Sequence, residues 1–246
     1  MSDAVTIDAF VAHLRDLGYR GLQVDRRPDQ ENRDSSDIDA IAGPFVIEHT
    51  SIDSLPNQRR DSDRFIRAVG GVEQEVEGSL PFRLSITIEY SAVGKGQDWA
   101  AIRRALAAWL INQTAALPDG RSLVTGLPGI PFRLHIVKSS EQRPGVFFAR
   151  FQPEDETLSV RVRQAFERKA VKLRKYQGPG IITVLLFENH DIALMNNWKM
   201  LEAIRAAYPS GLPAGVDQVW YADTSIPSAL VFRDCTSQLR DGAVQS

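Results

Sequence analysis

Apolar residues recur along this chain at two spacings, one typical of helices and the other typical of strands. Spacings of three and four residues predict helices over residues 7–17, 60–76, 99–117, 157–176 and 197–208. Alternation with polar residues, or a short unbroken apolar run, predicts strands over residues 38–42, 45–52, 82–90, 132–139, 145–152, 181–187, 217–222 and 228–233. Because helices and strands are intermixed, we expect one α/β domain over residues 1–246, with a mixed central β-sheet flanked by helices.

The composition is that of an ordinary globular chain and excludes several classes of protein. Hydrophobic residues make up 43% of the chain, too many for a disordered protein, and 29 basic against 31 acidic side chains exclude a uniformly basic polyanion-binding protein. Cys235 is the single cysteine, and the four scattered histidines lack the paired spacing of a zinc enzyme. The N-terminus lacks a signal-peptide pattern, and the apolar run at 181–187 is too short to cross a bilayer. We therefore expect a cytoplasmic protein with no membrane partner.

Two acidic side chains near residue 40 form the first candidate site. Gly43-Pro44 is a turn signal between two predicted strands, which therefore form a hairpin. Side chains alternate along each strand, so the hairpin brings Asp39 and Glu48 to one side, with Thr50 on the same face as Glu48. Converging carboxylates are the ligands that a hard divalent cation such as Mg²⁺ prefers. The alternative is that the two acids lie apart on a solvent-facing strand surface.

The order of these elements resembles the PD-(D/E)XK nuclease superfamily, which has a restriction-endonuclease-like fold. The shared features are an opening helix, Asp39 on one strand, Glu48 followed two residues later by a polar residue on the next strand, and then a helix. The resemblance implies a nuclease-like core over about residues 5–90, with the C-terminal part completing the sheet. It also implies that Asp39 and Glu48 hold one or two metal ions, Mg²⁺ or Mn²⁺.

Thr50 occupies the position where that family has a lysine that helps to activate water. All six lysines lie at or beyond Lys95, so a small shift in register cannot supply one. Family members are known to move this charge to a neighbouring helix. The resemblance therefore implies a substitute cation, which is Arg60 or Arg64 on the next helix, or a lysine from a distant helix.

The predicted helix over residues 157–176 carries the second candidate site. It has seven basic residues and one acid, and four of the bases form one helical stripe: Arg161, Arg168, Lys172 and Lys175. Acids exceed bases by seven over residues 1–80, whereas bases exceed acids by five over residues 81–246. A face of one sign suits the phosphate backbone of a nucleic acid. The alternative is a solvated helix face with no partner, and the sequence favours neither.

Together these features predict a metal-dependent phosphodiesterase that acts on nucleic acid through a metal-activated water. Asp39, Glu48, Thr50 and Arg60 are its expected catalytic residues, and the basic helix is its expected phosphate-binding surface. A homodimer is a further possibility. The main alternative is a nuclease-fold binding or adaptor protein without enzymatic activity, which the missing lysine at position 50 favours. A small-molecule enzyme unrelated to nucleic acid is a third possibility.

Overall fold

The computed structural model describes residues 2–31, 37–191 and 193–240. Its contacts divide the chain into two compact units, here called the first unit (residues 1–56 and 155–246) and the second unit (residues 57–154). Each unit has its own β-sheet with helices packed against it. The expected mixed α/β class is confirmed, but the expected single central sheet is wrong, since the strands form two sheets. The division of the chain into one domain stays a prediction.

The sheet of the first unit has five strands in the order β1-β2-β7-β8-β9. Their bounds are Ala40–Ala42 for β1, Phe45–Ser51 for β2, Ile182–Asn189 for β7, Gln218–Asp223 for β8 and Val231–Asp234 for β9. Strands β2, β7 and β8 are parallel, while β1 and β9 run antiparallel at the two edges. The predicted hairpin is confirmed as β1 and β2, and Gly43 in its turn has a φ of 51°, which favours glycine.

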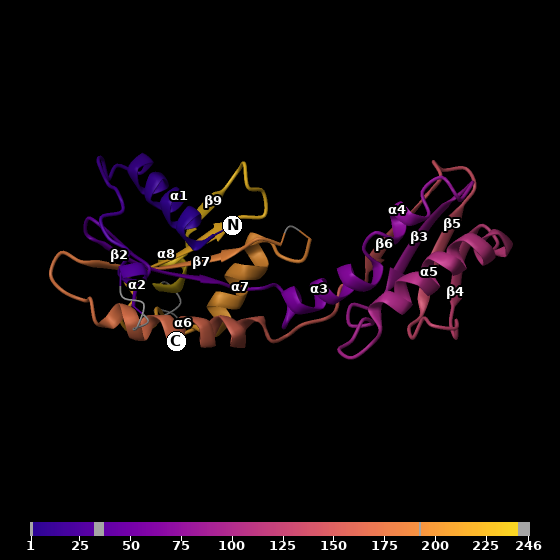
Figure 1. Ribbon diagram of the computed structural model, residues 1–246. Helices are drawn as coiled ribbons and strands as arrows, with labels where there is room; N and C mark the ends of the chain where they lie inside the picture. Colours follow the sequence, from indigo (N-terminus) through magenta and orange to yellow (C-terminus); the bar gives the residue numbers. More distant parts are fainter. Residues whose placement is uncertain (1, 32–36, 192, 241–246) are drawn as a thin grey trace. The chain divides into compact units, whose positions relative to one another are not determined.

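Helices cover both faces of this sheet (Figure 1). Helix α1 (Asp3–Asp16) packs on one face through a core that includes Phe10, and α6 (Leu158–Arg174) and α7 (Asn197–Ala207) pack on the other through a core that includes Phe166. Short helices α2 (Pro28–Glu31) and α8 (Thr236–Arg240) complete the unit. Strand β7 is buried on both faces, as its unbroken apolar run predicts.

Alternation along β2 divides its polar side chains between the two faces. Val46 belongs to the core under α6 and α7, and Ile47 belongs to the core under α1. Glu48 therefore lies on the α6 side of the sheet, and His49 lies on the α1 side. The two consecutive residues belong to different sites, separated by the thickness of the sheet.

The sheet of the second unit has four strands in the order β4-β5-β3-β6. Their bounds are Gly120–Val124 for β4, Leu134–Ser139 for β5, Arg83–Ile88 for β3 and Gly145–Arg150 for β6. The helices of this unit are α3 (Gln58–Val69), α4 (Val72–Glu75), α5 (Trp99–Gln113) and the 3-10 turn η1 (Thr114–Ala116). The resemblance implied a core over about residues 5–90 that would include β3, but β3 belongs to the sheet of the second unit. Residues 155–246 instead supply β7, the strand beside β2.

No helix within the described ranges 2–31, 37–191 and 193–240 is long and apolar enough to cross a bilayer.

Candidate functional site: a carboxylate–lysine cluster

Asp39 and Glu48 face each other across the hairpin of the first unit. Ala40 pairs with Ile47 in the antiparallel register, so one step further along places Asp39 opposite Glu48 on the same face. An Asp39 Oδ2 atom accepts a hydrogen bond of 2.6 Å from the backbone N–H of His49, which holds the aspartate against β2. The two carboxylates proposed from the sequence therefore approach one another on the α6 side of the sheet.

Two lysines from α6 hold Glu48, which is fully buried. Lys169 donates a hydrogen bond to Glu48 Oε1, and the Nζ atom of Lys172 lies 2.9 Å from the same oxygen. Lys172 also donates to the backbone carbonyl of Asp37 at 2.6 Å. The two lysines are three residues apart on the helix, so their side chains leave it in the same direction. Thr50, buried on the same face of β2, carries no charge, and α6 supplies the cations instead.

The electrostatics of this cluster centre on Glu48. Burial raises the pKa of Glu48 above its usual value, and repulsion from Asp39 raises it further, while Lys169 and Lys172 act in the opposite direction. Glu48 Oε2 is buried and has no hydrogen-bond partner among the described residues. A buried carboxylate oxygen without a partner is costly, so this atom is suited to an additional ligand.

Binding of a divalent metal ion by this cluster stays a prediction, and the chemistry of its oxygen atoms bears on it. Glu48 Oε2 and the carboxylate of Asp39 are hard oxygen donors on one face of the hairpin, as Mg²⁺ or Mn²⁺ requires. The lysines act against such an ion, because two ammonium groups balance the charge of the two carboxylates. The fit therefore rests on the unpartnered oxygen rather than on an excess of negative charge.

The arginines expected near Glu48 lie on α3 in the second unit. Arg60 has a half-exposed side chain whose Nε is 3.8 Å from Asp61, and Arg64 contacts the same aspartate at 3.2 Å. The structure therefore gives both arginines a local acidic partner. A catalytic role for Arg60 stays a prediction.

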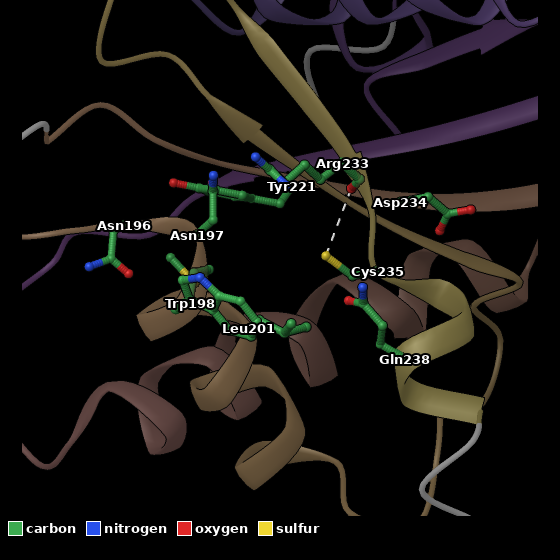
Figure 2. Close-up of a pocket in the computed structure, with 10 residues that line it drawn as sticks. Asn196, Asn197, Trp198, Leu201, Tyr221, Arg233, Asp234, Cys235 and Gln238 are labelled. Carbon is green, nitrogen blue, oxygen red and sulfur yellow. Dashed lines mark hydrogen bonds between the residues drawn. The ribbon is translucent and has the colours of Figure 1, made fainter.

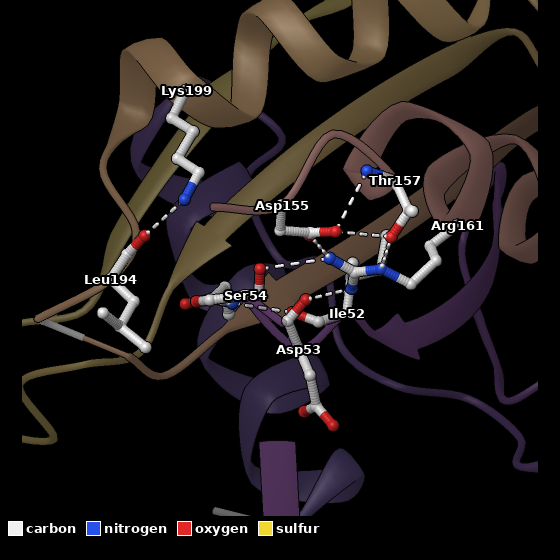
Figure 3. A network of polar contacts seen from close by, with 9 residues as sticks. Ile52, Asp53, Ser54, Asp155, Thr157, Arg161, Leu194 and Lys199 are labelled. Carbon is white, nitrogen blue, oxygen red and sulfur yellow. Dashed lines mark hydrogen bonds and ion pairs between the residues drawn. The ribbon is translucent and has the colours of Figure 1, made fainter. Parts of the chain in front are cut away.

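The basic stripe of α6 divides into two inward and two outward cations. Arg161 donates to the backbone carbonyls of Asp53 and Ser54 and pairs with Asp155 at 2.7 Å (Figure 3). Burial acts to raise the pKa of Asp155, but hydrogen bonds from Thr157 and from Arg161 outweigh it and lower the pKa below its usual value.

Of the other three cations in the stripe, Lys172 turns inward to Glu48, whereas Arg168 and Lys175 are exposed. Among the described residues neither the Arg168 nor the Lys175 side chain makes a hydrogen bond or an ion pair, although the charge of Lys175 helps to lower the pKa of Asp37. Phosphate binding by the stripe stays a prediction, and the exposed pair is the part of the stripe that suits it.

A separate hollow of about 490 Å³ lies beside α7 and the β8–β9 edge of the same sheet (Figure 2). Its apolar wall includes Tyr221 and Leu201, and its rim includes Trp198, whose side chain is largely exposed. Burial raises the pKa of the Cys235 thiol in this hollow to about 11, so the thiol stays protonated at neutral pH. A protonated thiol is a poor nucleophile.

No family model matches the chain, and neither a curated protein nor a solved structure matches it.

Proposed function

We propose that this protein is a metal-dependent phosphodiesterase that acts on nucleic acid, with a PD-(D/E)XK-type core in its first unit. The observation that carries the proposal is the contact of Lys169 and Lys172 with Glu48, opposite Asp39. The chain has Thr50 where the family has a lysine, and Lys169 and Lys172 of α6 bring the positive charge to Glu48 instead. The order α1, β1, β2, α6 and β7 around the cluster supports a restriction-endonuclease-like arrangement.

The side chains of the cluster would divide the work as follows. Asp39 and Glu48 Oε2 would hold Mg²⁺ or Mn²⁺, and the bound ion would polarise a phosphoryl oxygen and lower the pKa of the attacking water. Lys169 and Lys172 would keep Glu48 ionised and provide fixed positive charge toward the charge that develops on phosphorus oxygens. The exposed Arg168 and Lys175 would contact backbone phosphates, so binding would weaken as the salt concentration rises.

The second candidate function is a nucleic-acid-binding or adaptor protein without enzymatic activity. The observation that favours it is the charge balance of the cluster, in which two ammonium groups neutralise two carboxylates. A neutral cluster attracts a divalent ion less strongly than a bare pair of carboxylates does. Under this alternative the lysines serve only to compensate a buried charge.

A cleavage assay on the full chain distinguishes the two functions. The wild-type protein is incubated with single-stranded DNA, duplex DNA or RNA, with Mg²⁺, with Mn²⁺ or with a chelator, and the products are separated by size. Metal-dependent cleavage is expected. Loss of a residue that only supports a metal ligand typically lowers activity ~10–100-fold, and Glu48→Gln, which removes a proposed ligand, should lower the cleavage rate by more than that. Lys169→Met should also reduce it.

The matched control is Glu167→Gln, which makes the same chemical change at an exposed position of α6. It should cleave at the wild-type rate, and circular dichroism checks that each variant is folded. Full metal-dependent cleavage by Glu48→Gln would refute the proposal. Binding of nucleic acid by the wild type without cleavage of any substrate would establish the second candidate instead.

A further inference from the structure

A second polar cluster lies on the other face of the first sheet, under α1. Asp3 from the first turn of α1, His49 from β2 and Glu188 from β7 each place one ligand atom within 4.8 Å of the others. Parallel pairing sets Ser51 beside Glu188, so His49 and Glu188 lie on neighbouring strands with their side chains on the same face. The sheet separates this cluster from Glu48, the residue that precedes His49.

His49 and Glu188 are buried in this cluster, and the hydrogen bonding of His49 is incomplete. The His49 side chain is only 1% exposed, and its Nε2 atom has no hydrogen-bond partner in the part of the chain that the structure describes. Nε2 lies 3.6 Å from Glu188 Oε2, and Nδ1 lies 3.7 Å from Asp3 Oδ1, both too long for hydrogen bonds. Buried imidazole nitrogens normally have a hydrogen-bond partner, whereas Nε2 has only the longer ion-pair contact with Glu188, so this atom is suited to a further ligand.

The spacing of His49 Nε2 and Glu188 Oε2 suits two atoms that share a metal ion, whereas Asp3 lies nearer the other ring nitrogen, Nδ1. Bonds of ~2.0–2.2 Å to a tetrahedral zinc ion separate its ligand atoms by roughly 3.3–3.6 Å, close to the spacing of His49 Nε2 and Glu188 Oε2. The Asp3 side chain is 72% exposed, so a small rotation brings its carboxylate to the same ion. The hydroxyl of Thr6 donates to Glu188 Oε2 at 2.7 Å, the kind of outer contact that orients a ligating carboxylate.

We propose that Asp3, His49 and Glu188 form a binding site for a zinc-type divalent ion, with water as the remaining ligand. One imidazole nitrogen with two carboxylates suits Zn²⁺ or Co²⁺ better than Mg²⁺, which prefers oxygen ligands alone. The three ligands come from α1, β2 and β7, so the ion ties the first helix of the chain to the two central strands. An ion that binds only the folded state raises stability. This site is independent of the phosphodiesterase proposal.

The test uses full-length protein from which metals and any polyhistidine tag have been removed. Co²⁺ is titrated in and its visible absorption followed, and thermal melting is recorded with and without Zn²⁺. In wild-type protein one of the bound Co²⁺ ions should give the spectrum of a low-coordinate site, and the protein should melt at a higher temperature with Zn²⁺. Asp3→Asn should weaken Co²⁺ binding at least tenfold and reduce the Zn²⁺ shift of the melting temperature, while its exposed position leaves folding intact.

Two further variants identify which cluster holds the ion. Asp16→Asn makes the same change at an exposed position near the far end of α1 and should bind as the wild type does. Glu48→Gln alters only the cluster on the opposite face and should keep the Co²⁺ spectrum, whether or not the protein cleaves nucleic acid. Equal Co²⁺ binding by wild type and Asp3→Asn would overturn the proposal, as would a spectrum that Glu48→Gln alone removes.

Discussion

The charge of Glu48 depends on the two lysines of α6, and their removal tests this dependence. At the 2.9 Å separation of Lys172 Nζ and Glu48 Oε1, the Coulomb attraction is about 6 kcal/mol with an effective dielectric constant of about 20. The cost of removing both ions from water offsets most of that attraction. Loss of every partner leaves a buried charge uncompensated, which destabilises proteins by ~3–5 kcal/mol. We expect the free energy of unfolding of Lys169→Met/Lys172→Met to fall by that amount at pH 7.

The single variants and a rescue variant locate this effect. Lys169→Met or Lys172→Met alone leaves Glu48 with one ammonium partner, so each should cost less than half of the double variant. Adding Glu48→Gln to the double variant removes the uncompensated charge and should restore most of the lost stability. The matched control is Arg168→Met/Lys175→Met, which removes the same charge from exposed positions of the same helix and should change stability little.

The assay is urea unfolding followed by circular dichroism, with the free energy of unfolding extrapolated to water. Two results would refute the reasoning. One is a double variant that is no less stable than its exposed control. The other is a loss of stability that Glu48→Gln fails to restore, because the cost would then arise from lost packing of the lysine stems rather than from the charge of Glu48.

Two further predictions concern pH and the second unit. The pKa of Glu48 in the folded protein lies above its usual value of 4.5, so the folded protein binds this proton more readily than the unfolded chain does. The stability of wild type relative to Glu48→Gln should therefore rise as the pH falls from neutral toward 4.5. Urea unfolding at several pH values measures this difference, and a difference that does not vary with pH contradicts the prediction. Lys138 is buried and donates to the backbone carbonyls of Thr114 and Ala115 in η1 and of Leu117 just after it, at 2.7–3.2 Å. Lys138→Met should therefore lower the free energy of unfolding by about 2–4 kcal/mol in the same assay, whereas Lys95→Met at an exposed position should change it little.

Much of the local structure follows from short-range patterns. The helix over residues 157–176 and the hairpin around Gly43-Pro44 form where predicted, because helical spacing and turn residues act over a few positions. The opposite facing of Glu48 and His49 follows in the same way from strand alternation. The pairing of Asp39 with Glu48 needed only the register of one hairpin.

The composition of each cluster depends on residues far apart in the sequence. Lys169 lies 121 residues after Glu48, and it reaches Glu48 because α6 packs across β2 and β7. The basic stripe alone cannot distinguish Lys172, which turns inward, from Lys175, which stays exposed. The spacing of the histidines in the sequence does not reveal the cluster around His49, because its neighbours Asp3 and Glu188 come from the first turn of α1 and from β7.

The sequence by itself therefore determined the longer helices, the hairpin and the face on which each residue of β2 lies, because these depend on periodicity and on neighbouring residues. It did not predict strand β4, whose residues look like a loop by composition. Only the tertiary structure decided that the strands form two sheets, that β7 rather than β3 completes the sheet of the hairpin, and that α6 supplies lysines to Glu48. These features depend on which apolar faces pack together over long separations in the chain. Burial of those faces brings a carboxylate and its compensating cations to one place.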